Sequence, residues 1–292
     1  MRWLYHITET RSHGPEDARY SAPSLVTEGF LHASYRKDVV ESGGLYFPTG
    51  SQLRVLQIDP RRLDVPVEIA DTPRGPMPHV HGSIPADAIH ATLALHEMER
   101  APDRVTGTKI ALVAFSGMTL LDLVGAHDPL SRIVSMGFDA SASITLVSAD
   151  VSRPWSLGGG AFVVDGVRPS LEPFDVVVIA GGPGTRVLEK DVEVINWIAS
   201  FPHNRLLASV CTGSLLLGAA GRLDGKRATT HGSALDRLAE FGATAVRERV
   251  VDEGQVVTAG GVTCAIDLGL HLVRRLEGAE VAAAIAKQME VT

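Results

Sequence analysis

The sequence has no long uncharged apolar run, no block of Lys and Arg residues, and only two cysteines. A membrane-spanning helix needs about 20 consecutive apolar residues, so the first absence predicts a protein without membrane segments. Nucleic acids and anionic membranes attract basic patches, so a net charge of -7 without such a patch predicts that neither is a partner. Two cysteines in 292 residues are too few for a disulfide framework, and both are expected as free thiols.

A secretory signal is also absent from the first residues, "MRWLYHITET", which contain no apolar stretch that leads to a small-residue cleavage site. A cytoplasmic location is therefore expected. The hydrophobic fraction of 45% and the charged fraction of 21% are those of an ordinary globular protein rather than a disordered one. Small molecules or other proteins are the expected partners.

The composition changes along the chain. Seven of the eleven histidines lie before residue 97, whereas most of the apolar, glycine-rich segments lie after residue 108. The polar stretch "HEMERAPDRVTGTK" separates the two parts and predicts a linker at about 97 to 107. We therefore expect two domains, residues 1–96 and residues 108–292, each long enough to bury its own core.

The C-terminal part alternates between strand-like apolar runs and segments with helical spacing. The apolar runs lie at residues 109–115, 143–149, 174–182, 205–210 and 255–261. This alternation predicts an α/β domain with a doubly wound parallel sheet. In such a sheet, ligands bind beyond the carboxyl ends of the strands, so the loops that follow the strands are the segments to examine.

The N-terminal part is less regular. Its short strand-like pieces "RWLYHIT", "GFLHAS", "LRVLQID" and "VPVEIAD" are separated by turn-rich segments, and this pattern predicts a small α+β domain.

Cys211 follows directly on a strand-like run, in the stretch "LLASVCTGS". If a helix begins at the next residues, the thiol lies at a tight strand-to-helix elbow. The positive end of the helix dipole would then favour the reactive thiolate. The alternative is that the cysteine only fills space in the core, because cysteine is among the most buried residue types. The local pattern favours neither interpretation.

Two further segments favour a functional site at the carboxyl ends of the strands, where Cys211 is expected. The loop "AGGPG" (180–184) follows an apolar run, and its free backbone N–H groups could hold a developing negative charge. The loop lacks the lysine and the glycine spacing of nucleotide-binding loops, so no nucleotide is expected there. Asp122, in "MTLLDLVG", is a carboxylate among leucines, and it is expected either to face solvent or to have a partner.

Four segments together resemble the ThiJ/PfpI superfamily across residues 108 to 290: "LLDLVG", "FDVVVIAGGPG", "SVCTGSLLLGAAGRLDGKRATTH" and "VVTAGGVTCAIDLGLHLV". The resemblance implies a flavodoxin-like fold. The threonine after the cysteine and the aspartate look like the isonitrile hydratase branch, which adds water to an isonitrile to give an N-substituted formamide. This resemblance implies that Cys211 is the nucleophile, Asp122 the acid/base and Thr212 an assisting hydroxyl, with Gly182 as a backbone N–H donor.

The sequence also departs from other branches of this superfamily. The peptidase-like branch carries histidine where Thr212 stands, and no His-x-Glu signature of glutamine amidotransferases is apparent. Related transcription activators continue into a helix-turn-helix pair, whereas this chain ends at Thr292, so a DNA-binding regulator is not expected. His231 could assist the thiolate or only cap its helix. Cys264 is expected to pack in the core.

Two alternatives to the hydratase remain. Glyoxalase-like members act on small dicarbonyls and usually present a glutamate near the cysteine, which Asp122 disfavours. A thiol-based redox or ligand sensor would use oxidation of Cys211 as its signal. Superfamily members commonly dimerise, so the resemblance implies a homodimer, and no cofactor is expected.

The N-terminal pieces "LYHIT", "EGFLHAS", "LQIDPRRL", "VEIAD" and "PHVHGSIPADAI" resemble a family of small bacterial domains of unknown function, over residues 1 to 95. An ADP-ribosyltransferase-like fold has been suggested for that family. It implies that His6 and His32 lie in an NAD-type cleft, with His81 or Glu68 as further candidates. Equally, these histidines mark turns and a polar pocket without chemistry. "HVH" lacks the carboxylate or cysteine of a metal site, so no metal is expected.

Overall fold

The computed structural model describes residues 2–9 and 18–291, and it divides into two units, residues 1–105 (unit 1) and residues 106–292 (unit 2). Each unit has its own hydrophobic core. Among the described residues, no helix is both long enough and apolar enough to cross a membrane.

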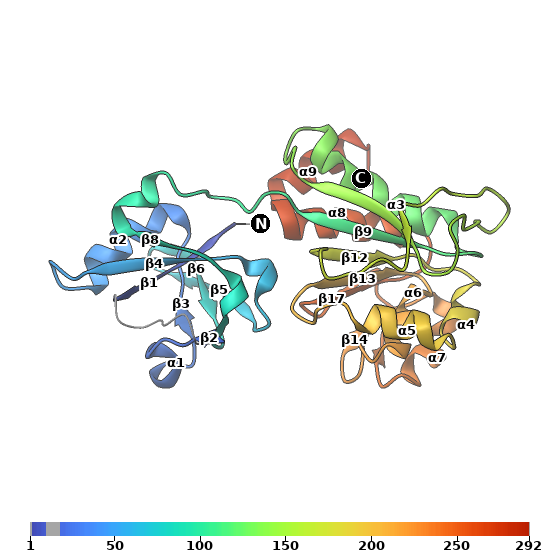
Figure 1. Cartoon of the computed structure of the whole chain (residues 1–292), viewed down its shortest axis with the longest axis horizontal. Coiled ribbons are helices and arrows are strands. Elements are labelled where there is room, and N and C mark those ends of the chain that lie inside the picture. The colour runs from blue at the N-terminus through green and yellow to red at the C-terminus, as the bar shows by residue number, and fades with distance from the viewer. Residues whose placement is uncertain (1, 10–17, 292) are drawn as a thin grey trace. The chain divides into compact units, whose positions relative to one another are not determined.

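A seven-stranded sheet forms the centre of unit 2 (Figure 1). Its strand order is β11-β10-β9-β12-β13-β17-β16, and all neighbours are parallel except β17 and β16. The strands are β9 (Lys109–Ala114), β10 (Ser143–Ser148), β11 (Gly166–Val167), β12 (Val176–Ile179), β13 (Leu206–Val210), β16 (Val250–Asp252) and β17 (Val256–Ala259). A separate pair joins β14 (Arg227–Ala228) to β15 (Thr244–Ala245). The predicted doubly wound α/β domain is confirmed, with one antiparallel edge strand that the apolar runs did not indicate.

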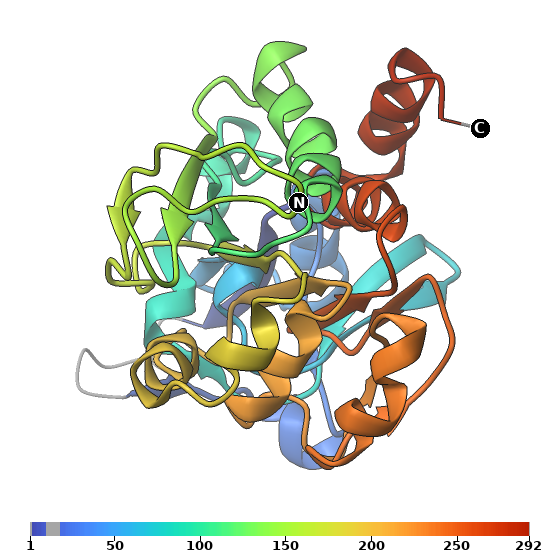
Figure 2. The same cartoon turned by 90° about the vertical axis from the view of Figure 1, so that its right-hand side faces the viewer.

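Helices cover both faces of this sheet. They are α3 (Leu120–Ser135), α4 (Thr185–Leu188), α5 (Val192–Ala199), α6 (Gly213–Ala219), α7 (Leu235–Ala239), α8 (Cys264–Glu277) and α9 (Ala279–Gln288). Figures 1 and 2 show α3, α8 and α9 on one face and α4 to α7 on the other. Because both faces are covered, the central strands are mostly apolar, and every residue of β12 and β13 is buried.

Close packing fixes α3 against α8. A Cβ atom at Gly125 would lie 2.8 Å from the Cβ of Ala265, so only glycine lets the two helices approach this closely. The first turn of α3 carries Asp122, and this contact therefore helps to hold that residue over the carboxyl edge of the sheet.

Away from the carboxyl ends of the strands, side chains donate hydrogen bonds to the carbonyl groups of connecting loops. The Arg205 guanidinium donates to the carbonyl oxygens of Glu172 and Phe174, with Nη1 2.8 Å from the second oxygen. The Trp197 indole donates to the carbonyl of Pro169 at 2.6 Å. The Arg205 contacts lie at the amino ends of β12 and β13, so the connecting loops at the carboxyl ends are the ones left to form a site.

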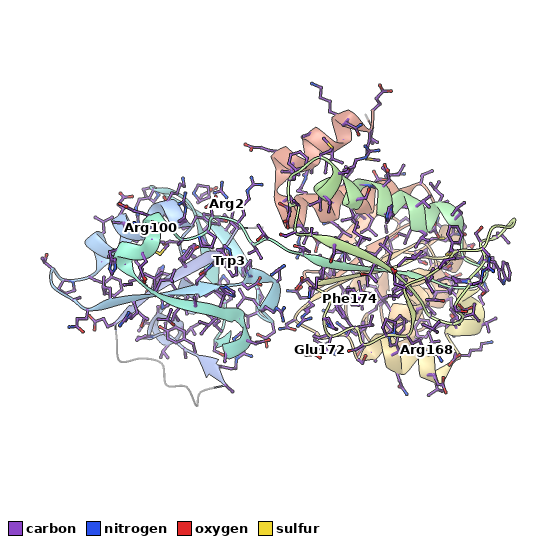
Figure 3. The ribbon with its side chains drawn as sticks, turned by 45° about the horizontal axis from the view of Figure 1, so that its top comes forward. Arg2, Trp3, Arg100, Arg168, Glu172 and Phe174 are labelled. Atoms are coloured by element: carbon purple, nitrogen blue, oxygen red, sulfur yellow. The ribbon has the colours of Figure 1, made fainter. Side chains whose placement is uncertain are left out.

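Unit 1 is a small, β-rich α+β domain. One antiparallel sheet has the order β1-β4-β8 and a second has the order β3-β6-β5. Its strands are β1 (Leu4–Glu9), β2 (Arg19–Tyr20), β3 (Leu31–His32), β4 (Leu53–Ile58), β5 (Val67–Thr72), β6 (Gly75–Val80), β7 (Ile84–Pro85) and β8 (Ile89–Ala94), and its helices are α1 (Ser24–Thr27) and α2 (Arg36–Tyr46). Trp3, labelled in Figure 3, is buried in one of its two core clusters, with its ring centroid 4.9 Å from that of His90.

Candidate functional site

Cys211 lies at the elbow between β13 and α6. Its φ of 54° falls in the left-handed region, which residues other than glycine rarely adopt. Its N–H lies 2.9 Å from the carbonyl oxygen of Ala259 and 3.0 Å from that of Gly260. Its own carbonyl accepts hydrogen bonds from the hydroxyls of Ser214 at 3.1 Å and Thr230 at 3.0 Å. These bonds hold a strained backbone that presents the thiol at the carboxyl edge of the sheet.

The carboxyl group of Asp122 meets this thiol. Only 1% of Asp122 is exposed, and its Oδ2 accepts a hydrogen bond from the N–H of Gly181 at 3.2 Å. Oδ1 is buried and has no hydrogen-bond partner within the described part of the chain. Burial raises the pKa of Asp122 to about 7, while hydrogen bonds from the Cys211 thiol and the Gly181 N–H oppose the rise. Asp122 therefore changes its charge near neutral pH.

The thiol itself is held protonated. Burial is the main cause that raises the pKa of Cys211 to about 12, the negative charge of Asp122 adds to it, and a hydrogen bond from the N–H of Thr212 acts against it. This corrects the expectation that the helix dipole favours the thiolate. The physical reason is that Cys211 is only 4% exposed and lies beside a carboxylate, at the end of a helix of only 7 residues. A base must remove the thiol proton, and Asp122 is in contact with it.

Thr212 joins the cysteine elbow to the glycine loop. Its hydroxyl accepts a hydrogen bond from the N–H of Gly182 at 2.9 Å and donates one to the carbonyl of Gly182 at 3.1 Å. The Gly182 N–H is therefore already engaged. For Gly182 to serve as the predicted donor to a substrate, the hydroxyl of Thr212 has to turn away.

Two glycines, one in the loop after β12 and one at the start of α6, determine how closely the loop, the cysteine elbow and Asp122 approach one another. A Cβ atom at Gly181 would lie 2.7 Å from the nitrogen of Thr212 and 2.8 Å from Oδ2 of Asp122. A Cβ atom at Gly213 would lie 2.6 Å from the carbonyl oxygens of Ile179 and Ala180. Real Cβ contacts are longer than this, so only glycine at these positions allows thiol, carboxyl and loop to meet.

The other two predicted residues of unit 2 lie apart from this contact. His231 caps the 3₁₀ turn at Gly232–Ala234: its Nδ1 accepts the N–H of Ser233 at 3.3 Å. Across residues 18–291, no hydrogen bond joins His231 to Cys211. Cys264 is 6% exposed at the start of α8, as expected for core packing, and both cysteines are free thiols.

Three residues that the sequence reasoning did not select complete the site: Gly181, Ser214 and Thr230. All three lie in the segments that carried the resemblance, close to the predicted residues in the chain. Their small size was visible in the sequence, but which backbone atoms they would bind was not.

In unit 1, the ring of His6 contacts the backbone of His32 rather than its ring. The Nδ1 atom of His6 lies 2.6 Å from the carbonyl oxygen of His32, and its Nε2 lies 2.9 Å from the phenol oxygen of Tyr20. The ring of His32 pairs instead with the carboxylate of Glu28, at 3.1 Å. Burial lowers the pKa of His6 to about 4, so this imidazole is neutral at neutral pH.

His6 and His32 also line one cavity of about 980 Å³. His81 and Glu68 pair with each other at 3.1 Å and are not among its lining residues. Within residues 2–9 and 18–291, no group of three or more His, Cys, Asp or Glu side chains has an arrangement that could hold a metal ion.

Two family models match the chain. The DJ-1/PfpI family matches residues 108–275, which is more than half of the sequence, so the chain belongs to this family. The predicted resemblance is thereby confirmed. A protein family of unknown function, DUF952, matches residues 7–92.

Similar proteins include an enzyme and a regulator. An isonitrile hydratase of Pseudomonas putida is 36% identical over 183 residues, which cover 62% of this chain and 78% of the hydratase. The transcriptional regulator GbdR of Pseudomonas aeruginosa is 28% identical, over 64% of this chain and 51% of the regulator. The crystal structure of a ThiJ/PfpI family protein from Pseudomonas syringae superimposes with a TM-score of 0.57 and 32% identity, covering 69% of this chain and 82% of that one.

Because a DNA-binding regulator is among these relatives, the comparisons do not support the expectation that nucleic acid is excluded as a partner. A homodimer, a cytoplasmic location and the roles of the site residues stay predictions from the sequence.

Proposed function

We propose that this DJ-1/PfpI family member is a cysteine-dependent enzyme that adds water to an isonitrile and releases an N-substituted formamide. The observation that carries the proposal is the buried contact between the Cys211 thiol and the Asp122 carboxyl. The 36% identity with a protein named isonitrile hydratase supports the choice of substrate class.

In the first half of the reaction, ionised Asp122 takes the thiol proton while sulfur attacks the terminal isonitrile carbon. A carbon–sulfur bond forms, and the electron pair left on that carbon accepts the proton back from Asp122. The product is a thioformimidate, in which carbon is bound to sulfur and hydrogen and doubly bonded to nitrogen. Because Asp122 has a pKa of about 7, it can both accept and return this proton near neutral pH.

In the second half, water adds to the same carbon. Asp122 receives one water proton as oxygen attacks and passes it to the nitrogen, which becomes N–H. The carbon–sulfur bond then breaks, the hydroxyl proton returns to sulfur through Asp122, and the formamide leaves. One water is consumed and the enzyme is unchanged. Oδ1 of Asp122, which has no hydrogen-bond partner among the described residues, is free to take the water proton.

The burial of the sulfur also bears on the substrate. Because only 4% of Cys211 is exposed, a reacting carbon has to reach it through a narrow approach. The terminal carbon of an isonitrile carries no substituent besides nitrogen, whereas a dicarbonyl carbon is flanked on two sides. The geometry therefore favours the isonitrile over a glyoxalase substrate.

The thiol-sensor alternative loses support from the same site. Oxidation by peroxide requires a low-pKa, accessible thiolate. Cys211 has a pKa raised to about 12 and is buried, which is the opposite environment.

The test is conversion of cyclohexyl isocyanide to N-cyclohexylformamide by the purified full-length chain, followed by chromatography. We expect turnover that Cys211→Ala reduces at least about a thousandfold, because the covalent step is lost. Cys264→Ala is the matched control, since it also removes a buried thiol but lies outside the contact with Asp122. Equal rates for the wild type and Cys211→Ala would overturn the proposal.

A further inference from the structure

We propose that the cavity of unit 1 is a binding site for a small molecule that carries a protonated amine on an apolar or aromatic body. The cavity has a volume of about 980 Å³, in the range of small-molecule sites. It lies wholly within unit 1, so the inference is independent of the reaction proposed for unit 2.

The first support is the direction of the hydrogen bonds around His6, which lines the cavity. A carbonyl oxygen can only accept, so Nδ1 of His6 must carry the proton that binds the oxygen of His32, 2.6 Å away. His6 is neutral at neutral pH, because burial lowers its pKa to about 4, and its Nε2 is therefore an acceptor. The Tyr20 hydroxyl, 2.9 Å away, must donate to it. The Tyr20 hydroxyl therefore has no proton left to donate to a ligand.

A second chain of hydrogen bonds gives the same result at Ser34. The Ser42 hydroxyl donates to the carbonyl of Asp38 at 2.8 Å, so its proton is used. In the contact between the two serine hydroxyls, at 3.4 Å, Ser34 must therefore be the donor. Both serines line the cavity, and the Ser34 oxygen keeps only its acceptor capacity. Two buried hydroxyls, one on β2 and one just after β3, thus favour a ligand that donates hydrogen bonds.

The charged side chains that line the cavity also favour a ligand that donates hydrogen bonds. The carboxylates of Glu9 and Glu28 line the cavity. One guanidinium, that of Arg74, also lines it. Its Nη2 donates to the carboxylate of Glu41 at 3.0 Å and its Nη1 to the hydroxyl of Ser42 at 3.1 Å, whereas its buried Nε has no hydrogen-bond partner among the described residues. An ammonium group is attracted to such walls. The pyrophosphate of a dinucleotide would place two negative charges beside two carboxylates, so the walls disfavour the NAD-type ligand that the sequence resemblance implied.

The remaining walls suit an apolar body. Ile7, Ala33, Phe47 and Met77 contribute apolar surface. The ring of His79, which also lines the cavity, stacks on Phe30, with centroids 3.9 Å apart and planes 11° from parallel. Burial lowers the pKa of His79, so this ring also tends to be uncharged. Flat, uncharged rings can stack on an aromatic group of the ligand, and their faces add a weak attraction for a cation.

The experiment compares three fluorescent probes of one shape: 2-(1-naphthyl)ethylamine, 2-(1-naphthyl)ethanol and 1-naphthylacetate. They differ only in the polar end, which is a cation, a neutral hydroxyl or an anion. Each is titrated into the full-length chain, with NAD as a fourth ligand. We expect the amine to bind at least about tenfold more tightly than the acetate, with the alcohol between them.

Two variants locate the site. Glu28→Gln removes a carboxylate that lines the cavity, whereas Glu68→Gln removes one that also pairs with a histidine but lies outside the lining. We expect Glu28→Gln to weaken amine binding at least about threefold and Glu68→Gln to leave it unchanged. Both side chains are exposed, so neither change threatens folding.

Three outcomes would overturn the inference. They are tighter binding of the acetate or of NAD than of the amine, equal effects of the two variants, and no amine binding up to millimolar concentration. Each is readable without any assay of isonitrile turnover, so this inference and the proposed function can fail separately.

Discussion

Both units bury titratable side chains, yet they arrange the partners of those side chains differently. In unit 2, Asp122 and Cys211 touch each other, and burial raises both pKa values, to about 7 and about 12. In unit 1, His6 lies between a backbone carbonyl and a phenol, and burial lowers its pKa to about 4. Burial disfavours the charged form in all three cases.

The difference lies in where a proton can go. The thiol and carboxyl of unit 2 can exchange a proton, so the site is suited to a reaction. The imidazole of unit 1 keeps its proton on Nδ1 against a carbonyl, and its neighbour Tyr20 is fixed as a donor to it, so the site is suited to binding. The two sites are therefore suited to different tasks because the partners of their buried groups differ, rather than because the burial of those groups differs.

Among changes that leave the Cys211 thiol in place, the largest effect is expected when its proton exchange with Asp122 is broken. Asp122→Asn keeps the shape but cannot take a proton, so isonitrile turnover should fall about a hundred- to a thousandfold. The steady-state rate of formamide release measures this. Turnover within a factor of about three of wild type would show that the thiol needs no carboxylate.

The same variant should stabilise the fold. The folded-state pKa of Asp122 is raised from 3.8 to about 7, so its contribution to stability is complete below pH 3.8 and is lost as the pH rises through about 7. Asp122→Asn should therefore increase the free energy of unfolding by roughly 1 to 3 kcal/mol at pH 8, and by less at pH 5. Urea unfolding at both pH values measures the difference, and a gain that is larger at pH 5 would contradict it.

Adding a methyl group at Gly181 tests whether close approach, rather than the residue types alone, makes the pair reactive. Gly181→Ala places an atom 2.8 Å from Oδ2 of Asp122, so turnover should fall about tenfold or more and stability by roughly 1 to 3 kcal/mol. Gly44→Ala, where a Cβ meets nothing within 4 Å, is the control and should leave both unchanged or slightly raise stability.

The pH profile of turnover sharpens the comparison further. If ionised Asp122 is the base, kcat/KM should rise about tenfold between pH 6 and pH 8 and then level off, with an inflection near the pKa of about 7. Assays of initial rate across this range measure it. A rate that keeps rising tenfold per pH unit up to pH 10 would point to direct ionisation of the thiol instead.

The smallest effect concerns unit 1. His6 should stay neutral until the pH falls to about 4, so its ring-proton NMR signal should not move between pH 5.5 and pH 8. The signal is assigned by its loss in His6→Gln. A midpoint near 6.5 would show that the imidazole is hydrated, and the donor direction assigned to Tyr20 would then no longer follow.

Much of unit 2 could be predicted because its signals are local. The apolar runs that end at Val210 and follow Phe174 are buried on both faces, so they are continuous in the sequence and easy to recognise. The short strands β11 and β16 were missed because 2 and 3 residues carry no periodicity. In unit 1, four of the strands were visible and the resemblance implied a cleft at His6 and His32. The other walls of the cavity were not visible, because they come from segments far apart in the chain.

By itself, the sequence determined the alternation of strands and helices in unit 2 and the presence of a thiol and a carboxylate after two different strands. Only the tertiary structure decided that Asp122 touches Cys211, that burial raises rather than lowers the pKa of the thiol, and that His231 caps a turn. The physical reason is that secondary structure follows from side chains near in sequence, whereas burial and proton affinity depend on atoms that only folding brings together.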